Sequence, residues 1–168
     1  MKGRIMRRRL PLGVLAILVL AIVSLPAASA SSSQASSSAG GEKKVEVIRV
    51  NEVTVQEDFV DVGEEGPSLG DYFVFSADLF RHGKKVGTDG GVGTFVRVES
   101  DAFTVQFVAT AALPKGQITI QGHGILTDAP LKFELAITGG TGKYRTAHGT
   151  LTVEDVGGEI LLTFRIIR

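Results

Sequence analysis

A glycine-rich segment with a lysine, ELAITGGTGKYRTAHG at residues 134–149, has the composition of a loop that could hold a phosphate group. A phosphate-binding loop needs a glycine five residues before its Gly-Lys pair and a Ser or Thr directly after the lysine, because backbone amides surround the phosphates and the hydroxyl binds Mg²⁺. Ile137 and Tyr144 occupy those two positions. A dinucleotide-binding loop needs a further glycine where Arg145 stands, and no long helical pattern follows. The segment is therefore interpreted as a glycine-rich corner that joins two strands.

Other residue types that carry chemistry lack the arrangement that the chemistry needs. The three histidines, His82, His123 and His148, are expected in a turn and on two different strands, and no pair has metal-ligand spacing, so no metal site is predicted. The chain has no cysteine that could act as a nucleophile. The carboxylates are expected in turns or on solvent-facing strand faces rather than in an acid–base pair: Glu46, Glu52, Glu99, Glu134, Glu154 and Asp155.

The first expected strand carries two polar residues on a face that is otherwise apolar. Its odd-numbered positions read Val45, Val47, Arg49, Asn51, Val53 and Val55. A charge buried without a partner is costly, so Arg49 and Asn51 are candidates for binding the polar group of a ligand. Two alternatives stay open: Arg49 pairs with a core acid such as Asp71, or a bulge turns both side chains outward.

The elements that must position these residues are short strands. From Lys43 onward, β-rich runs separated by turn residues recur at a steady spacing, which is typical of an all-β sandwich or barrel. The connections carry turn formers and no helical run is long enough for a crossover, so neighbouring strands are expected to be antiparallel. Eight strands are predicted, at residues 44–56, 71–80, 85–98, 103–112, 117–126, 131–138, 146–156 and 159–167.

Alternation along these strands assigns their faces, because successive side chains point to opposite sides. Phe73 and Phe75 share an apolar face, Phe103 begins the apolar face of the fourth run, and His123 falls opposite that of the fifth. Eight up-and-down strands of this kind close into a barrel whose bore is filled by side chains or holds one small ligand. The predicted fold is an all-β, eight-stranded antiparallel up-and-down barrel, with a sandwich as the alternative.

The first thirty residues are expected to be a secretory signal peptide. A lysine and four arginines precede the apolar run LPLGVLAILVLAIVSL, and Pro26 stands before AASA, where small residues permit cleavage. An uncleaved anchor is the alternative, because the run approaches the roughly 20 residues that span a bilayer. The serine-rich residues 31–42 are expected to be a flexible spacer, and residues 43–168 the barrel domain of a secreted protein that leaves the membrane after cleavage.

The charge of the chain depends on that segment. Residues 1–30 hold five basic residues and no acid, which leaves 13 Lys and Arg against 18 Asp and Glu, a net charge of −5. An acidic domain without a basic stripe is not expected to bind nucleic acid. Since there is no cysteine to form a disulfide, an apolar core must hold the domain together.

Several segments together resemble the allene oxide cyclase and dirigent protein superfamily. RVNE, LGDYFVFSADLF, GKKVGTDGG, ITIQG and LAITGGTGKYRTAHG occur in its order and spacing, and the similarity spans nearly all of residues 45–168. The resemblance implies an eight-stranded antiparallel barrel, commonly a homotrimer, with an apolar pocket and no cofactor. It also implies that the glycine-rich segment enters the seventh strand, with Arg145 near the barrel mouth.

The polar groups of the cyclase pocket are mostly replaced in this chain. The resemblance places Asn51 at one of its polar positions, but Arg49 stands where the cyclases carry a glutamate and Ala77 where they carry a second asparagine. Gly93 and Gly124 stand at the positions of a cysteine and a tyrosine. The resemblance therefore implies a pocket without the fatty-acid epoxide cyclisation. The dirigent ending Ala-Arg-Gly is changed to Ala-His-Gly, which also argues against radical coupling.

Two principal hypotheses follow for the function. One is a cofactor-free cyclase or isomerase that folds a flexible apolar substrate against the barrel wall. The other is a non-catalytic secreted module that binds a small hydrophobic molecule with an anionic or carbonyl group, held by Arg49. A dirigent-like protein that steers radical coupling is the third. The expected ligand-binding residues are Arg49, Asn51, Asp71, Phe73, Phe75, Phe103 and Arg145.

Overall fold

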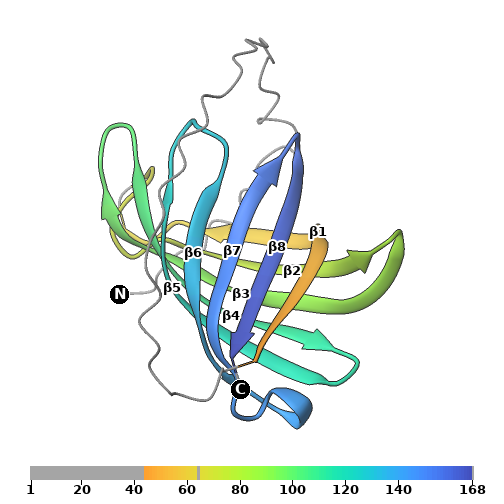
Figure 1. The fold of residues 1–168 in the computed structure, drawn as a ribbon. Helices are drawn as coiled ribbons and strands as arrows, with labels where there is room; N and C mark the ends of the chain where they lie inside the picture. The colour runs from red at the N-terminus through yellow and green to blue at the C-terminus, as the bar shows by residue number, and fades with distance from the viewer. Residues whose placement is uncertain (1–43, 64, 168) are drawn as a thin grey trace, which may run out of the picture. The chain divides into compact units, whose positions relative to one another are not determined.

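The computed structural model describes residues 44–63 and 65–167, drawn in colour in Figure 1. The expected signal peptide (1–30) and spacer (31–42) lie outside the described residues. Within the described part of the chain, no helix has the length and apolar character needed to cross a bilayer.

The described residues form a closed barrel of eight antiparallel strands in chain order, so the predicted fold is confirmed and the sandwich is excluded (Figure 1). Each strand pairs with its sequence neighbours, and β8 closes the barrel on β1. The elements are β1 (Val45–Val60), β2 (Tyr72–Arg81), β3 (Lys84–Val98), β4 (Phe103–Leu113), β5 (Gly116–Leu126), β6 (Lys132–Gly140), the 3₁₀ turn η1 (Gly142–Tyr144), β7 (His148–Val156) and β8 (Glu159–Ile167).

The core lies inside the barrel and follows the alternation that a strand imposes. Leu162, Phe164 and Ile166 on β8 are buried, and Ile118 and Ile120 on β5 are buried in the same way. The residues that alternate with them along each strand point outward. His123 on β5 is exposed, as its position opposite the apolar face predicts. Burial of one face of every strand supplies the apolar core that a chain without disulfides needs.

The glycine-rich segment is a corner between β6 and β7, as predicted. Its backbone docks on the β4–β5 hairpin, where Thr141 N–H donates to Gln117 O (2.9 Å) and Lys143 N–H donates to Lys115 O (2.8 Å). Gly142 has a φ of +56°, and a Cβ there would lie 2.6 Å from Lys115 O. Glycine is therefore required at this position for the close approach of two backbones. The glycine content that resembles a phosphate-binding loop thus serves the packing of the corner.

The prediction for the two faces of β1 is wrong. Ile48 and Val50, at even positions, are buried in the core, whereas Val53 and Val55 are more than half exposed. The odd-numbered face, which includes Arg49, points outward. The strand has β-branched residues on both faces, so hydrophobicity alone did not distinguish the inner face from the outer one.

A bulge in β1 changes which positions face inward. Thr54 pairs with Ala77 and Gln56 with Ser76, which leaves one extra residue between them. Beyond this point the odd positions turn inward, so that Glu57 lines the interior and Phe59 packs against the core. The bulge follows Arg49 and Asn51 in the chain, so it does not explain the outward direction of Arg49.

Candidate functional site

The barrel encloses an apolar cavity of about 250 Å³. This volume suits one small molecule, because ligand sites are apolar clefts with a few polar groups. The cavity is lined by residues of all eight strands and the β5–β6 connection: Glu52, Thr54, Glu57, Phe73, Phe75, Asp89, Phe107, Ala109, Ile120, Leu126, Leu131, Phe133, Leu135, Leu151, Val153, Ile160 and Leu162.

Phenylalanine rings form much of this lining, and they contact one another. The rings of Phe73 and Phe107 meet edge to face with centroids 5.9 Å apart, and those of Phe107 and Phe133 stack at 5.2 Å. Phe75 lies 6.3 Å from Phe73, again between ring centroids. These distances and angles are favourable for aromatic pairs, and the three rings form one contacting group in the cavity wall.

Two glycines leave the space in which these rings lie. A Cβ at Gly93 would clash with the ring of Phe73, and a Cβ at Gly124 would lie 2.8 Å from the ring of Phe107 and 3.0 Å from that of Phe133. The rings therefore rest against backbone. Gly93 and Gly124 are the positions at which the resemblance places a cysteine and a tyrosine, so aromatic rings from neighbouring strands fill the space of those side chains.

Among the three acidic residues that line the cavity, Glu52 on β1 and Asp89 on β3 are less exposed than Glu57. Asp89 is only 7% exposed, and its Oδ1 has no hydrogen-bond partner among the described residues. It stands opposite Ala77 on β2 and Ala111 on β4, both buried and small. Because neither alanine can hydrogen bond through its side chain, the carboxylate projects into an apolar environment.

Burial shifts the acidity of both groups. Desolvation raises the pKa of Asp89 to about 6, with the backbone N–H of Gly90 opposing the shift. Desolvation, followed by the negative charges of Asp89 and Glu57, raises the pKa of Glu52 to about 7. At neutral pH, Glu52 thus exists in both protonation states and Asp89 is mainly ionised. Such a pair can exchange protons with a bound molecule.

A surface groove adjoins the cavity at Glu52, Thr54 and Ile160, which line both. On its outer side lie Asn51 and Glu159, whose side chains hydrogen bond, together with His82. Glu52 therefore stands where the apolar interior meets a polar groove, a position that gives the carboxyl group access to solvent protons.

The structure brings together some of the sequence-predicted residues and separates others. Phe73 and Phe75 line the cavity. Phe103 is not among its lining residues but stacks on Phe95, with centroids 5.1 Å apart, and Phe95 in turn contacts Phe59. These three rings form a separate part of the core.

Asp71 is completely buried but does not face the cavity. Its carboxylate accepts hydrogen bonds from the backbone N–H groups of Val62 and Ser68, both at 2.7 Å, and from the Ser68 hydroxyl at 3.2 Å. It holds the loop between β1 and β2. Residues 66–70 of this loop also have the pattern Gly-x-Ser-x-Gly, which was not singled out from the sequence, but no helix follows to make the elbow of a hydrolase.

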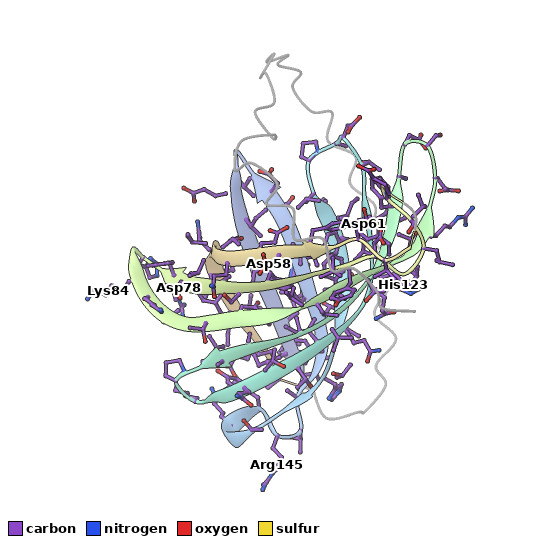
Figure 2. The ribbon with its side chains drawn as sticks, turned by 180° about the vertical axis from the view of Figure 1, so that it is seen from behind. Asp58, Asp61, Asp78, Lys84, His123 and Arg145 are labelled. Carbon is purple, nitrogen blue, oxygen red and sulfur yellow. The ribbon has the colours of Figure 1, made fainter. Side chains whose placement is uncertain are left out.

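The remaining expected residues lie outside the barrel interior. Arg49 is exposed in a surface groove with Lys132 and Arg165, and is not paired with Asp71. Asn51 belongs to the outer groove described above. Arg145 is exposed in the β6–β7 connection, and Figure 2 shows it pointing away from the barrel. In an up-and-down barrel this connection lies at the opposite end from the β5–β6 connection that borders the cavity.

Three acidic residues of the cavity, Glu52, Glu57 and Asp89, were missed by sequence reasoning. Glu52 was assigned to a solvent-facing side because β1 was given the wrong inner face. Asp89 stands among four glycines, Gly87, Gly90, Gly91 and Gly93, where alternation of apolar residues is too weak to assign a face. A signal for Asp89 was its spacing, since it lies an even number of residues before Phe95, which is buried.

Residues 49–166 match the family described as the allene oxide cyclase barrel like domain. A solved structure of a pyocyanin demethylase is 33% identical, with a TM-score of 0.66 over 72% of this chain and 99% of that chain. A pterocarpan synthase dirigent protein is 21% identical, with a TM-score of 0.55 over 75% of this chain and 96% of the other. The Diels–Alderase AbmU from Streptomyces koyangensis is 18% identical, with a TM-score of 0.55 over 77% and 72%. The latter two show likeness of fold alone. Curated protein sequences gave no significant match.

Proposed function

The chain belongs to the allene oxide cyclase barrel-like family, and on this premise we propose that it binds a flat aromatic molecule inside its barrel and acts on it by proton transfer through Glu52 and Asp89. The observation that carries the proposal is the joint presence, in one cavity of about 250 Å³, of phenylalanine rings and two carboxyl groups with raised pKa values.

The ring geometry supports an aromatic occupant. Phe73, Phe107 and Phe133 hold each other in fixed orientations by edge and stacking contacts. A flat ligand can add a further ring to this arrangement and gain the same aromatic contacts. A wall fixed before binding also lowers the entropy lost when the ligand enters.

The two carboxyl groups support acid–base chemistry. Glu52, with a pKa of about 7, can donate or accept a proton near neutral pH. Asp89, with a pKa of about 6, is mainly ionised at neutral pH and can therefore accept a proton as the base. A reaction that proceeds by proton transfer needs no cofactor, in keeping with what the family resemblance implies.

The pyocyanin demethylase suggests which aromatic molecules to try first. Its name gives a substrate, pyocyanin, which is a flat three-ring phenazine, and its sequence is 33% identical to this chain. We propose phenazines and other two- or three-ring heteroaromatic compounds as the substrate class. A purely binding role for the same cavity is the second candidate, favoured by the loss of the cyclase groups at Ala77, Gly93 and Gly124.

The proposal is tested by incubating the purified protein with pyocyanin and unsubstituted phenazine in D₂O, with binding followed by absorbance and exchange of pyocyanin hydrogen for deuterium followed by mass spectrometry. We expect both compounds to bind the wild type. We expect the turnover to be deuterium exchange into pyocyanin, because the carboxyl groups remove a proton and return a deuteron. Glu52→Gln and Asp89→Asn are expected to keep binding of unsubstituted phenazine but lose most turnover, while the outer-face variant Glu134→Gln keeps both. Binding without any deuterium exchange would support the binding module, and absence of binding would overturn the proposal.

Secretion and trimer formation remain part of the proposal. The signal peptide is supported by the sequence of residues 1–30. Subunit contact is supported by an outward apolar row, because Val74, Val92 and Val108 stand directly opposite one another on β2, β3 and β4. The mass of the protein recovered from the culture medium tests cleavage, and light scattering of the purified domain tests for a trimer; a monomer would contradict it.

A further inference from the structure

We infer that the molecule bound in the barrel is a cation whose positive charge is spread over a flat ring system. The inference rests on the proposed function, since it names the charge of the ligand that the same cavity takes. It follows from the charges that line the cavity, from an unpartnered oxygen atom of Asp89, and from the aromatic rings in the cavity wall.

The charges that line the cavity are all negative. Glu52 and Glu57 face it from β1 and Asp89 from β3, and its lining includes no lysine, arginine or histidine. The strands β2, β4, β5, β6, β7 and β8 contribute apolar or small residues to it. The adjoining groove adds Glu159 and one titratable base, His82, on the far side of Glu52. An empty cavity at neutral pH therefore holds negative charge without a counterion from the described protein.

Asp89 supplies the second observation. Its Oδ1 is buried without a hydrogen-bond partner, a state that few polar atoms in folded proteins adopt. Such an atom costs free energy unless a ligand satisfies it. A cation beside Asp89 would compensate both the missing partner and the buried charge.

The aromatic rings in the cavity wall supply the third observation. The face of a phenylalanine ring carries partial negative charge and attracts cations that lie over it within about 6 Å. Phe73, Phe107 and Phe133 surround the same space as the carboxylates. A compact ammonium ion is strongly hydrated in water and covers little of the ring surface. A flat aromatic cation can contact the rings and the carboxylates together.

The same charges argue against an anionic ligand, which one hypothesis from the sequence included, together with a carbonyl ligand, because of Arg49. That arginine lies on the outer surface, so it cannot neutralise a carboxylate inside the barrel. A fatty acid or other anion would add a negative charge beside Glu52 and Asp89, and repulsion would oppose its entry.

Binding of a cation must also change the protonation of the carboxyl groups. With pKa values of about 7 and 6, Glu52 and Asp89 carry protons for part of the time below neutral pH. A cation favours their ionised forms, so its binding releases protons and becomes stronger as the pH rises from about 5 to about 8. A neutral ligand of the same shape would show no such increase.

The test compares three fluorescent probes that share one tricyclic frame. These are 10-methylacridinium, which is a cation, 10-methylacridone, which is neutral, and acridine-9-carboxylate, which is an anion. Titration of the full chain at pH 5 and pH 8 gives the dissociation constant of each. We expect the cation to bind at least about tenfold more tightly than the neutral probe at pH 8, as one well-placed charge contact allows. This preference should shrink at pH 5, and the anion should bind weakest.

Variants locate the effect in the cavity. Asp89→Asn is expected to remove most of the preference for the cation while keeping the affinity for 10-methylacridone, and Glu134→Gln, on the outer face, is expected to change neither. Circular dichroism confirms folding, and the pH dependence of the wild type tests the inference even where a variant fails to fold. Equal binding of cation and neutral probe, or tighter binding of the anion, would overturn the inference and leave the proposed function standing. If none of the three probes nor phenazine binds, the proposed function itself fails.

Discussion

Glu52 and Asp89 face the same cavity although β2 separates their strands, and the negative charge of Asp89 contributes to the raised pKa of Glu52. Ala77 on β2 stands opposite Asp89 on one side and Thr54 on the other, while Leu79 stands opposite Glu52. The two carboxyl groups therefore lie diagonally across β2. The resemblance implies an asparagine at the position of Ala77 in the cyclases, whereas in this chain the buried polar side chain is Asp89 on the neighbouring strand.

Asp89→Asn should stabilise the ligand-free protein at high pH. A carboxyl group whose pKa is raised in the folded state favours folding while it is protonated, below about pH 4, and this contribution is lost as the pH rises through about 6. The amide has no charge to bury, so we expect the free energy of unfolding to rise by about 1–3 kcal/mol at pH 8. Urea unfolding of both proteins at pH 8 and pH 4 measures this. A variant that is less stable at pH 8 would contradict the account.

Gly93→Ala should disturb the cavity through Phe73. The added methyl group occupies space that the ring of Phe73 now fills, so the ring must move toward the cavity. We expect a loss of about 1–3 kcal/mol in the free energy of unfolding, together with weaker binding of phenazine. The double variant with Phe73→Leu should recover part of the stability, because the smaller side chain leaves room. If the losses in the free energy of unfolding caused by Gly93→Ala and Phe73→Leu simply add in the double variant, the contact between residue 93 and the ring of Phe73 does not determine the stability.

Asp71→Ala should loosen the connection between β1 and β2. The substitution leaves the backbone N–H groups of Val62 and Ser68 without their acceptor. We expect a loss of about 2–4 kcal/mol in stability, since two backbone hydrogen bonds to the carboxylate and one from the Ser68 hydroxyl are broken. Hydrogen exchange should quicken at Val62 and Ser68 first. Asp128→Ala, an exposed change in the β5–β6 connection, is the matched control and should change little.

Arg49→Ala should leave binding in the barrel unchanged. Arg49 is exposed on the outer face, whereas Phe107 lies in the cavity wall. We expect Phe107→Leu, and not Arg49→Ala, to weaken the binding of phenazine. A titration of both variants measures the difference. Loss of binding in Arg49→Ala with the fold intact would show that a ligand site exists on the outer surface.

Much of the barrel could be predicted from the sequence because the signals that define its strands lie within short segments of the chain. Turn residues mark the ends of the strands, and alternation assigns the inner face wherever one face is clearly polar, as in β5. The interpretation of residues 134–149 as a corner was correct for the same reason: a phosphate loop requires particular residue types, and Ile137 and Tyr144 are not among them.

The site was harder to predict because it depends on relations between strands. In β1, valines occupy the outer face, and a single extra residue reverses the alternation in mid-strand. In β3, glycines give no alternation at all around Asp89. The resemblance identified the phenylalanine lining at Phe73 and Phe75, but not the acidic groups.

The extra residue in β1 also determines how insertions and deletions would affect this protein. Loss of Val55 would remove the bulge and still leave Glu52 and Glu57 facing inward, because Thr54 and Gln56 already pair with consecutive residues of β2. Loss of a residue before the bulge, between Glu52 and Thr54, would instead turn one part of the strand over relative to its neighbours. A deletion at Val55 therefore shortens the strand without exchanging the acidic inner face for the valine-rich outer face.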